Sequence, residues 1–296
     1  MTSEWSVSRL GDLSGTRIIV TGATNGVGLA TARALVRAGA HVIMAVRNVE
    51  FGAQRAAEIG GSTEVVKLDL ADQASVRAFP GLFEGDVDIL INNAGIVTTT
   101  RSETVDGFET MLGTNFLGPF ALTNLLFERV RKQIINVGSD GHKQGTFAFD
   151  DPHLRTSTWS SFPAYARSKL AVMLWGLELD RRLRVARSPV ISQLTHPGWV
   201  ASNLSNVSDK RVMAAFHTIV QSAANRLGND IDAGAATTLY CISEPIPPGS
   251  YVGIDSRLGL KGGPTLAGRS GNACSYDDAR RLWTFAEKET GTTLPV

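Results

Sequence analysis

Short apolar runs that alternate with helical patterns are the feature that most constrains the fold of this chain. Candidate strands cover residues 17–20, 41–46, 65–68, 89–92, 133–137, 190–194 and 251–254. Runs that are apolar throughout, rather than at every second position, are typical of parallel strands covered on both faces. Strand–helix alternation along most of the chain predicts an α/β fold, a doubly wound parallel sheet with helices on both faces.

No linker, internal repeat or low-complexity segment divides the 296 residues, so we predict a single domain over residues 1–296. The longest helical patterns cover residues 29–38, 106–131 and 163–184, and an amphipathic tail helix over 275–291 is expected to pack on the domain edge. Residues 202–229 are predicted to cover a substrate site. Within them, 210–227 has basic and apolar sides, which favours a covering helix over contact with a membrane.

Charge and composition exclude several classes of partner. A net charge of +1 implies neither nucleic acid nor an acidic membrane surface as a partner. Cys241 and Cys274 have no metal-ligand spacing, so we expect no metal site and a reducing compartment. The N-terminal residues lack a signal-peptide pattern, and no apolar run is long enough to span a bilayer, so we expect a cytoplasmic protein without a membrane span.

A glycine-rich turn connects the first candidate strand to the first helical pattern. Its sequence is Thr21-Gly22-Ala23-Thr24-Asn25-Gly26-Val27-Gly28. Glycine allows backbone to approach a pyrophosphate, and the start of a helix offers free N–H groups and the positive end of its dipole. The spacing G-x-x-x-G-x-G differs from the common dinucleotide pattern G-x-G-x-x-G. An ordinary strand-to-helix turn therefore remains an alternative on this segment alone.

Three further segments follow candidate strands directly. Asp69 and Leu70 follow the third strand, residues 92–95 end the fourth, and residues 197–200 follow the sixth. The carboxyl ends of parallel strands share one edge of the sheet, where open α/β sheets bind their ligands. The sequence therefore predicts a dinucleotide site at this edge.

A second group of side chains predicts proton transfer. Tyr165 and Lys169 are four residues apart, which places both on one face of a helix. A free phenol has a pKa of about 10, and a neighbouring ammonium favours the phenolate and lowers that pKa. Ser139 ends a buried strand, and Asn115 lies in a long helical pattern. Each of these residues alone also has a structural explanation.

These motifs, in this order over about residues 14–260, strongly resemble the short-chain dehydrogenase/reductase family. The sequence Ala45-Val46-Arg47-Asn48, the segment between Ser139 and Tyr165, and the Leu282-Trp283 tail are similar to the retinol-dehydrogenase-like and WW-domain-oxidoreductase-like subgroup. The resemblance implies a Rossmann-type fold and an oxidoreductase that interconverts a carbonyl and an alcohol on a small or medium apolar substrate. It also implies a homodimer or homotetramer, paired through the two long helices.

The resemblance assigns roles residue by residue. Ser139 would bond the substrate carbonyl, Tyr165 would act as acid and base, Lys169 would also bond the nicotinamide ribose, and Asn115 would hold a relay water. The family often has serine where this chain has Gly138. The implied cofactor contacts are Gly22, Thr24, Asn25, Gly26, Val27, Gly28, Arg47, Asn48, Asp69, Leu70, Asn93, Ala94, Gly95, Tyr165, Lys169, Pro197, Gly198 and Val200.

Arg47 predicts which dinucleotide binds. An acidic residue about twenty positions beyond the glycines would bond the ribose 2′-hydroxyl of NAD. Arg47 stands there instead, and a guanidinium suits a 2′-phosphate, so we expect NADP(H) in preference to NAD(H). A solvated surface arginine is the alternative. Many NADP-binding members also carry a basic residue where this chain has Asn25.

Two interpretations remain open. The aromatic and methionine side chains near the predicted site line a substrate pocket or belong to the core: Phe147, Phe149, Trp159, Trp199, Met213 and Phe216. His196 is read as structural. A non-catalytic NADP(H)-binding sensor or interaction protein on the same fold is the alternative to an enzyme, although such proteins often lose the serine, tyrosine or lysine that this chain keeps.

Overall fold

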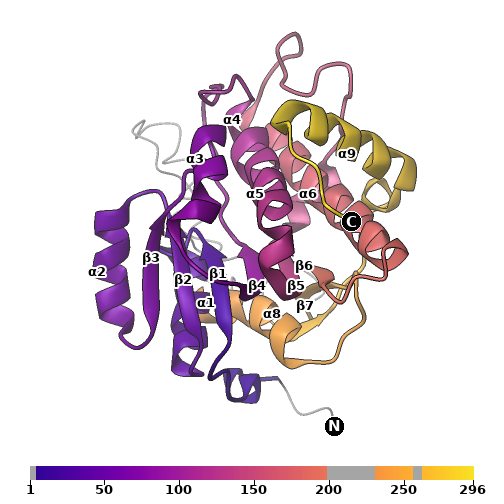
Figure 1. The fold of residues 1–296 in the computed structure, drawn as a ribbon. Coiled ribbons are helices and arrows are strands. Elements are labelled where there is room, and N and C mark those ends of the chain that lie inside the picture. The colour runs from indigo at the N-terminus through magenta and orange to yellow at the C-terminus, as the bar shows by residue number, and fades with distance from the viewer. Residues whose placement is uncertain (1–4, 199–230, 256–261) are drawn as a thin grey trace.

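The apolar runs form the centre of one eight-stranded sheet (Figure 1). A computed structural model describes residues 5–198, 231–255 and 262–296. The spatial order is β3-β2-β1-β4-β5-β6-β7-β8, with parallel pairs from β3 to β7 and an antiparallel pair between β7 and β8. The strands are β1 (Arg17–Thr21), β2 (His41–Val46), β3 (Thr63–Lys67), β4 (Val87–Asn92), β5 (Val130–Val137), β6 (Ile191–Thr195), β7 (Tyr251–Ile254) and β8 (Pro264–Leu266).

The predicted doubly wound α/β fold is confirmed, with corrections to its strands. β3 covers Thr63–Lys67 rather than residues 65–68, β5 starts before residue 133, and β8 was not predicted. β5 begins at Val130, so residues 130 and 131 are strand rather than the end of a helix. Exposed charged residues occupy the beginning of β5, where Arg131 forms an ion pair with Asp86 and Lys132 forms one with Asp88. Their polarity hides the strand pattern. The three-residue strand β8 has too few residues to show any pattern in the sequence.

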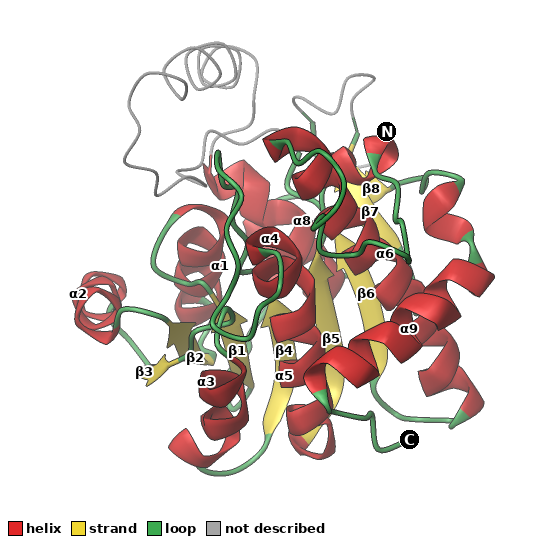
Figure 2. Cartoon of the chain, turned by 90° about the horizontal axis from the view of Figure 1, so that it is seen from above, coloured by secondary structure: helices red, strands yellow, loops and turns green. Residues whose placement is uncertain are grey.

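Helices cover both faces of the sheet (Figure 2). α1, α2 and α8 pack on one face, and α3, α5 and α6 pack on the other, with α9 over α5 and α6. The helices are α1 (Gly26–Arg37), α2 (Val49–Ile59), α3 (Gln73–Ala78), α4 (Thr110–Leu112), α5 (Gly118–Leu126), α6 (Ser161–Val185), α8 (Ile231–Ser243) and α9 (Tyr276–Thr290). A π-helical turn, Gly113–Leu117, joins α4 to α5.

α5 is a central helix rather than a surface helix. Every residue of α5 except Leu125 is buried, as expected for a helix that is apolar on all sides. α9 supplies its outer cover, because the Trp283 ring packs edge-on against Phe120 with centroids 5.0 Å apart. Ser275 caps the start of α9 by accepting from the Asp278 N–H, and Gly291 ends it in the left-handed conformation.

This cover bears on the predicted oligomer. The two long helices expected to pair between subunits are covered within the chain by α9, so that pairing would require another surface or the release of α9. A homodimer or homotetramer stays a prediction. The single-domain assignment also stays a prediction, because the predicted covering segment 202–229 lies outside the described residues. Trp199, Met213 and Phe216 lie outside them as well.

The described residues contain neither a membrane-spanning helix nor a metal-binding cluster. None of its helices combines the length and the apolar character needed to cross a bilayer. Among the same residues, no group of three or more histidine, cysteine, aspartate or glutamate side chains is placed to hold a metal ion.

Replacing Trp283 with alanine tests whether α9 is part of the core. Trp283 is 1% exposed, and emptying such a site costs about 3–5 kcal/mol of the free energy of unfolding. We expect urea denaturation of Trp283→Ala to show a loss of this size. Tyr276→Ala, on an exposed side chain of the same helix, should change the value by less than about 0.5 kcal/mol. Equal effects for the two variants would contradict this role of α9.

Candidate active site

The glycine-rich turn forms a tight cradle between β1 and α1. Gly22 and Gly26 have φ angles of 68° and 53°, in the left-handed region that favours glycine. A Cβ atom on Gly28 would lie 2.3 Å from Asn93 Nδ2 and 2.5 Å from the Gly22 oxygen. Asn25 precedes α1 without a side-chain capping bond, so the first N–H groups of the helix have no side-chain acceptor from this residue. The cradle therefore fits a phosphate group.

The cradle is fastened to the end of β4. Thr21 Oγ1 accepts hydrogen bonds from the backbone N–H groups of Asn93 and Ala94, both at 3.0 Å. The Asn93 side-chain Nδ2 donates to the backbone carbonyl oxygen of Thr21 at 2.8 Å. β1 and β4 are neighbours although the chain runs from β1 to β2, which makes this the switch point of the sheet. Dinucleotides bind at such a point.

The other predicted cofactor contacts form the rim of this edge. Arg47 is exposed at the end of β2 and makes no ion pair among the described residues, while Asn48 caps α2 by accepting from the Phe51 N–H. Asp69 Oδ1 accepts from the Ala71 N–H at 3.0 Å, which fixes the carboxylate at the end of β3. Thr24 and Val27 are partly exposed in the turn, and Leu70 is buried. Pro197 and Gly198 follow β6 at the same edge, whereas Val200 lies outside the described residues.

The four candidate catalytic residues come together beside this rim. A Cβ atom on Gly141 would lie 3.2 Å from a Tyr165 ring carbon and 3.4 Å from Ser139 Oγ, so these two side chains adjoin. A Cβ atom on Gly95 would lie 3.4 Å from Lys169 Nζ and 3.5 Å from Asn115 Oδ1. Four side chains from separate parts of the sequence therefore meet at the ends of β4 and β5.

Each of these side chains is held by the backbone around it. Ser139 Oγ accepts from the Gly141 N–H at 3.1 Å, and Lys169 Nζ donates to the Val137 oxygen at 3.0 Å. Asn115 lies in the π-helical turn, and its amide exchanges two hydrogen bonds with the Ile96 backbone. π-Helical turns of this kind are frequent at functional sites.

Burial shifts the pKa values of the tyrosine and the lysine. Desolvation lowers the pKa of Lys169 to about 8. Desolvation raises the pKa of Tyr165, and a hydrogen bond from Ser139 opposes this increase. The sequence predicts that Lys169 lowers the pKa of Tyr165. In the protein alone this is not met, because burial has the larger effect and the ammonium lies 6.0 Å from the centre of the phenol ring.

A polar network that the sequence analysis missed connects the serine turn to β6 and β7. Asp140 Oδ1 lies 3.0 Å from Lys143 Nζ, 3.4 Å from the Tyr251 hydroxyl and 3.6 Å from His196 Nε2. His196 Nδ1 accepts from the Gly198 N–H at 3.2 Å. Desolvation lowers the pKa of His196 to about 4, so it is neutral near pH 7. A neutral His196 is held between Asp140 and the Gly198 N–H, and its structural role stays a prediction. The position of Asp140 directly after Ser139 was the available signal for this network.

His142 supports the serine turn from the other side. Its Nδ1 lies 2.7 Å from the backbone carbonyl oxygen of Ser139. Its Nε2 lies 3.3 Å from the backbone nitrogen of Ser270, whose N–H can only donate. Nε2 is therefore the acceptor, and Nδ1 carries the proton that it donates to Ser139. Desolvation also lowers the pKa of His142, which favours this neutral form.

The predicted aromatic pocket divides into two groups. Phe147 and Phe149 belong to the core, because Phe147 packs against Phe285 of α9 and Arg281 of α9 lies over the Phe149 ring. Trp159 instead packs on a small apolar cluster that also contacts Tyr165. The core interpretation therefore holds for the two phenylalanines.

With this geometry in place, comparison with known proteins identifies the family. The short chain dehydrogenase family matches residues 16–212, which is more than half of the chain. The chain belongs to this family. It is 39% identical to human retinol dehydrogenase 12 over 93% of the chain and 86% of that protein, and 36% identical to mouse polyprenol dehydrogenase over 92% and 83%. These relatives confirm the retinol-dehydrogenase-like subgroup.

Solved structures agree with the fold. An uncharacterized protein from Mycobacterium paratuberculosis superposes with a TM-score of 0.86 at 38% identity, covering 99% of this chain and all of the other. A short-chain dehydrogenase from Burkholderia cenocepacia, solved with NADP, superposes with a TM-score of 0.61 at 22% identity, over 81% of this chain and 96% of the other, and shows the fold alone. The chain is thus a short-chain dehydrogenase/reductase, an enzyme class that acts on alcohol and carbonyl groups with a nicotinamide dinucleotide.

The buried charge of Lys169 predicts a pH-dependent stability. Its pKa is about 8 in the folded protein against 10.5 for a free lysine, so between these values the unfolded chain binds more protons. Stability then rises with pH across this window. We expect the free energy of unfolding of the wild type to gain about 3 kcal/mol relative to Lys169→Met between pH 7 and pH 10.5. Lys67→Met, at an exposed position of β3, is the control. A constant difference between wild type and Lys169→Met would contradict the buried charge.

Proposed function

We propose that this protein is an NADP(H)-dependent oxidoreductase that interconverts a carbonyl and an alcohol on a small or medium apolar substrate, with Tyr165 as acid and base. One observation carries the proposal. Ser139 and Tyr165 adjoin each other, with Lys169 and Asn115 beside them, at the sheet edge that holds the glycine cradle. A phosphate cradle and a proton donor at one edge are what a coupled hydride and proton transfer requires.

The cofactor NADP(H), when bound, would supply or accept the hydride, and in its oxidised form it would bring a positive charge to the nicotinamide end. The cradle at Gly22, Gly26 and Gly28 would hold its pyrophosphate. Lys169 Nζ lies near Gly95, beyond the end of β4 and next to Asn115. An ammonium there would hold the nicotinamide ribose.

The proton steps belong to side chains of the chain itself. Ser139 Oγ accepts from the Gly141 N–H and adjoins the Tyr165 side chain, so both hydroxyl-bearing groups face one place. In reduction, Tyr165 donates its proton to the substrate oxygen while Ser139 stabilises the developing charge on that oxygen. In oxidation, the tyrosine oxygen accepts the proton. A protonated Lys169 favours the phenolate in both directions.

The choice of an apolar substrate rests on the surroundings of Tyr165 and on the relatives. The side chains packed with Tyr165 on one cluster are apolar, including Ile96, Val97 and Trp159. The relatives are named for retinol and polyprenol, which are apolar alcohols. A polar substrate would leave its own hydrogen-bonding groups unpaired against such a wall.

Replacing Tyr165 with phenylalanine tests the proton step. The ring is kept and the proton donor is lost, so we expect turnover to fall by about 10²–10⁴-fold while NADPH affinity changes little. NADPH oxidation with a panel of aldehydes and ketones measures turnover, and NADPH titration measures binding. Tyr276→Phe, on an exposed residue of α9, is the matched control. A near-wild-type rate for Tyr165→Phe would sink the mechanism. Tight NADPH binding with no turnover in the wild type would instead support a non-catalytic sensor.

Replacing Arg47 with aspartate tests the cofactor choice. A charge-assisted bond to the 2′-phosphate contributes about 1.5–3 kcal/mol of binding free energy. Because Arg47 is exposed, we expect the lower end of this range, which corresponds to about tenfold in affinity. We expect NADPH to bind more tightly than NADH by this factor, and Arg47→Asp to abolish or reverse the preference. Arg37→Asp, an equal change of charge on an exposed residue of α1, should leave it unchanged. Titrations at one salt concentration measure both; equal affinities in the wild type would refute the assignment.

A further inference from the structure

A small apolar cluster lies on one side of Tyr165 and continues the predicted active site. Its buried centre consists of Met111, Leu154 and Ala164, against which Tyr165 and three partly buried apolar side chains pack: Ile96, Val97 and Trp159. We call these seven residues the Tyr165 cluster. Ile96 and Val97 follow Gly95 directly, at the carboxyl end of β4. The cluster therefore borders the place where a substrate oxygen must meet the phenol.

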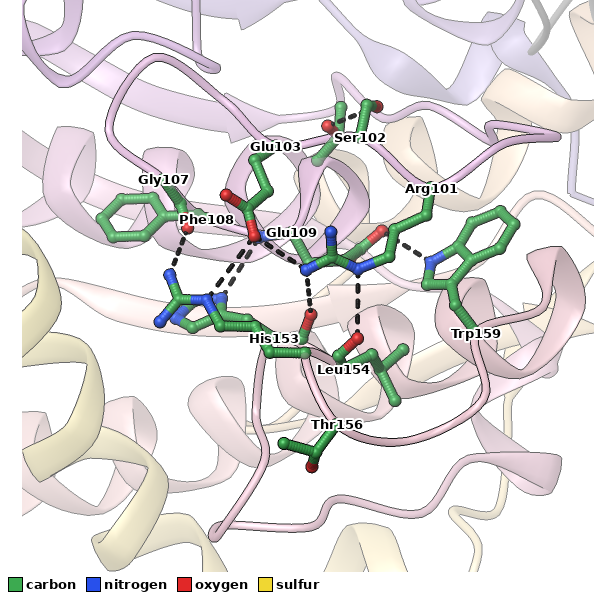
Figure 3. A network of polar contacts seen from close by, with 12 residues as sticks. Arg101, Ser102, Glu103, Gly107, Phe108, Glu109, His153, Leu154, Thr156 and Trp159 are labelled. Atoms are coloured by element: carbon green, nitrogen blue, oxygen red, sulfur yellow. Dashed lines mark hydrogen bonds and ion pairs between the residues drawn. The ribbon is translucent and has the colours of Figure 1, made fainter.

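Trp159 is the largest side chain of this cluster, and a buried carboxylate fixes its indole. Trp159 Nε1 donates to Glu109 Oε1 at 3.3 Å (Figure 3). The Leu112 N–H donates to Glu109 Oε2 at 2.8 Å. Glu109 is 2% exposed. A carboxylate is costly to bury and needs donors on both oxygens, so the N–H edge of the indole is held at Glu109.

His153 connects this carboxylate residue to the C-terminal helix. Its Nδ1 accepts from the Glu109 N–H at 3.2 Å, and its Nε2 lies 3.1 Å from Glu289 Oε2 on α9. The imidazole also stacks on Phe108, with ring centroids 5.6 Å apart and planes 12° from parallel. A continuous set of contacts thus runs from α9 through His153 and Glu109 to Trp159.

Exposure distinguishes Trp159 from the two fully buried tryptophans of the described residues. Trp175 and Trp283 are 1% exposed, whereas Trp159 is partly exposed and is preceded by four exposed residues, 155–158. An indole with its N–H edge bonded and part of its surface open is suited to receive an apolar chain.

We propose that Trp159 is a specificity-determining residue: its indole forms the wall against which the hydrocarbon chain of the substrate lies, and Glu109 and His153 are positioning residues that hold this wall. The inference rests on the proposed function and deepens it by assigning the apolar part of the substrate, beyond its reacting carbon, to the indole of Trp159. The reactive oxygen lies at Ser139 and Tyr165, and the chain extends along the Tyr165 cluster.

A series of aldehydes of increasing length tests the wall. With wild type, we expect kcat/KM for NADPH-dependent reduction to rise from butanal through hexanal and octanal to decanal. In Trp159→Ala this rise should largely disappear, with a loss of roughly tenfold to a hundredfold for decanal, expressed mainly in KM. Butanal, which is too short to lie along the wall, should react at nearly the wild-type rate, and NADPH affinity should be unchanged. Trp159→Phe keeps an aromatic wall and should retain most of the rise.

A matched control separates this role from general damage. Trp5 is another partly buried tryptophan whose Nε1 donates to a side chain, Ser243 Oγ at 3.0 Å, but it packs against α8 in the other core cluster. Trp5→Ala should leave the chain-length profile intact. Glu109→Gln replaces one acceptor oxygen with an NH₂ group that must face an N–H donor, so it should flatten the profile partly. A merely structural role would change all aldehydes equally.

The outcomes distinguish this inference from the proposed function. If the wild type reduces aldehydes and Trp159→Ala shows the wild-type dependence on length, the wall is refuted and the proposed function stands. If the wild type reduces neither these aldehydes nor any aldehyde or ketone of the panel used for Tyr165→Phe, the proposed function fails, and calorimetric titration of the NADP⁺-loaded protein with decanol still tests the wall. Binding that weakens at least tenfold in Trp159→Ala and not in Trp5→Ala would support it, and equal binding would overturn it.

Discussion

The close contact between the turn after β1 and the end of β4 determines the geometry of the whole ligand edge. Thr21 contributes both its hydroxyl and its carbonyl to residues 93 and 94, and Gly22 and Gly28 leave no room for a side chain between the two segments. Because β1 and β4 are neighbours in space but far apart in the sequence, this contact brings the phosphate cradle next to Gly95. Gly95 in turn borders the candidate active site, because Lys169 and Asn115 both adjoin Gly95.

Much of this arrangement could be predicted from the sequence, because strand ends of a parallel sheet share an edge. Apolar runs located β1 to β7, and the residues directly after them supplied the cradle, Asp69, Asn93 and Ser139. The resemblance to the short-chain dehydrogenases completed the list of candidates. Boundaries were wrong where charge obscured apolar character, as at Arg131, and where a strand was too short to show a pattern, as in β8.

Contacts that depend on tertiary structure could not be predicted. The Asp140–His196–Tyr251 network joins three strand ends, and the His153–Glu289 pair joins a loop to α9; neither follows from spacing along the chain. Burial could not be predicted either, and it decides the direction of the pKa shift at Tyr165. The sequence placed a cation near the phenol, but only the structure shows that desolvation outweighs it.

The cover provided by α9 has a consequence for synthesis on the ribosome. α5 lies near the middle of the chain, whereas its outer contacts come from the far end: Trp283 on Phe120, and Thr292 accepting from the Asn124 side chain. A nascent chain therefore carries an uncovered apolar helix until residues 276–292 have been synthesised. During this interval α5 is a site where chaperones bind or aggregation begins. Residues 276–292 thus decide whether a newly made molecule completes its core.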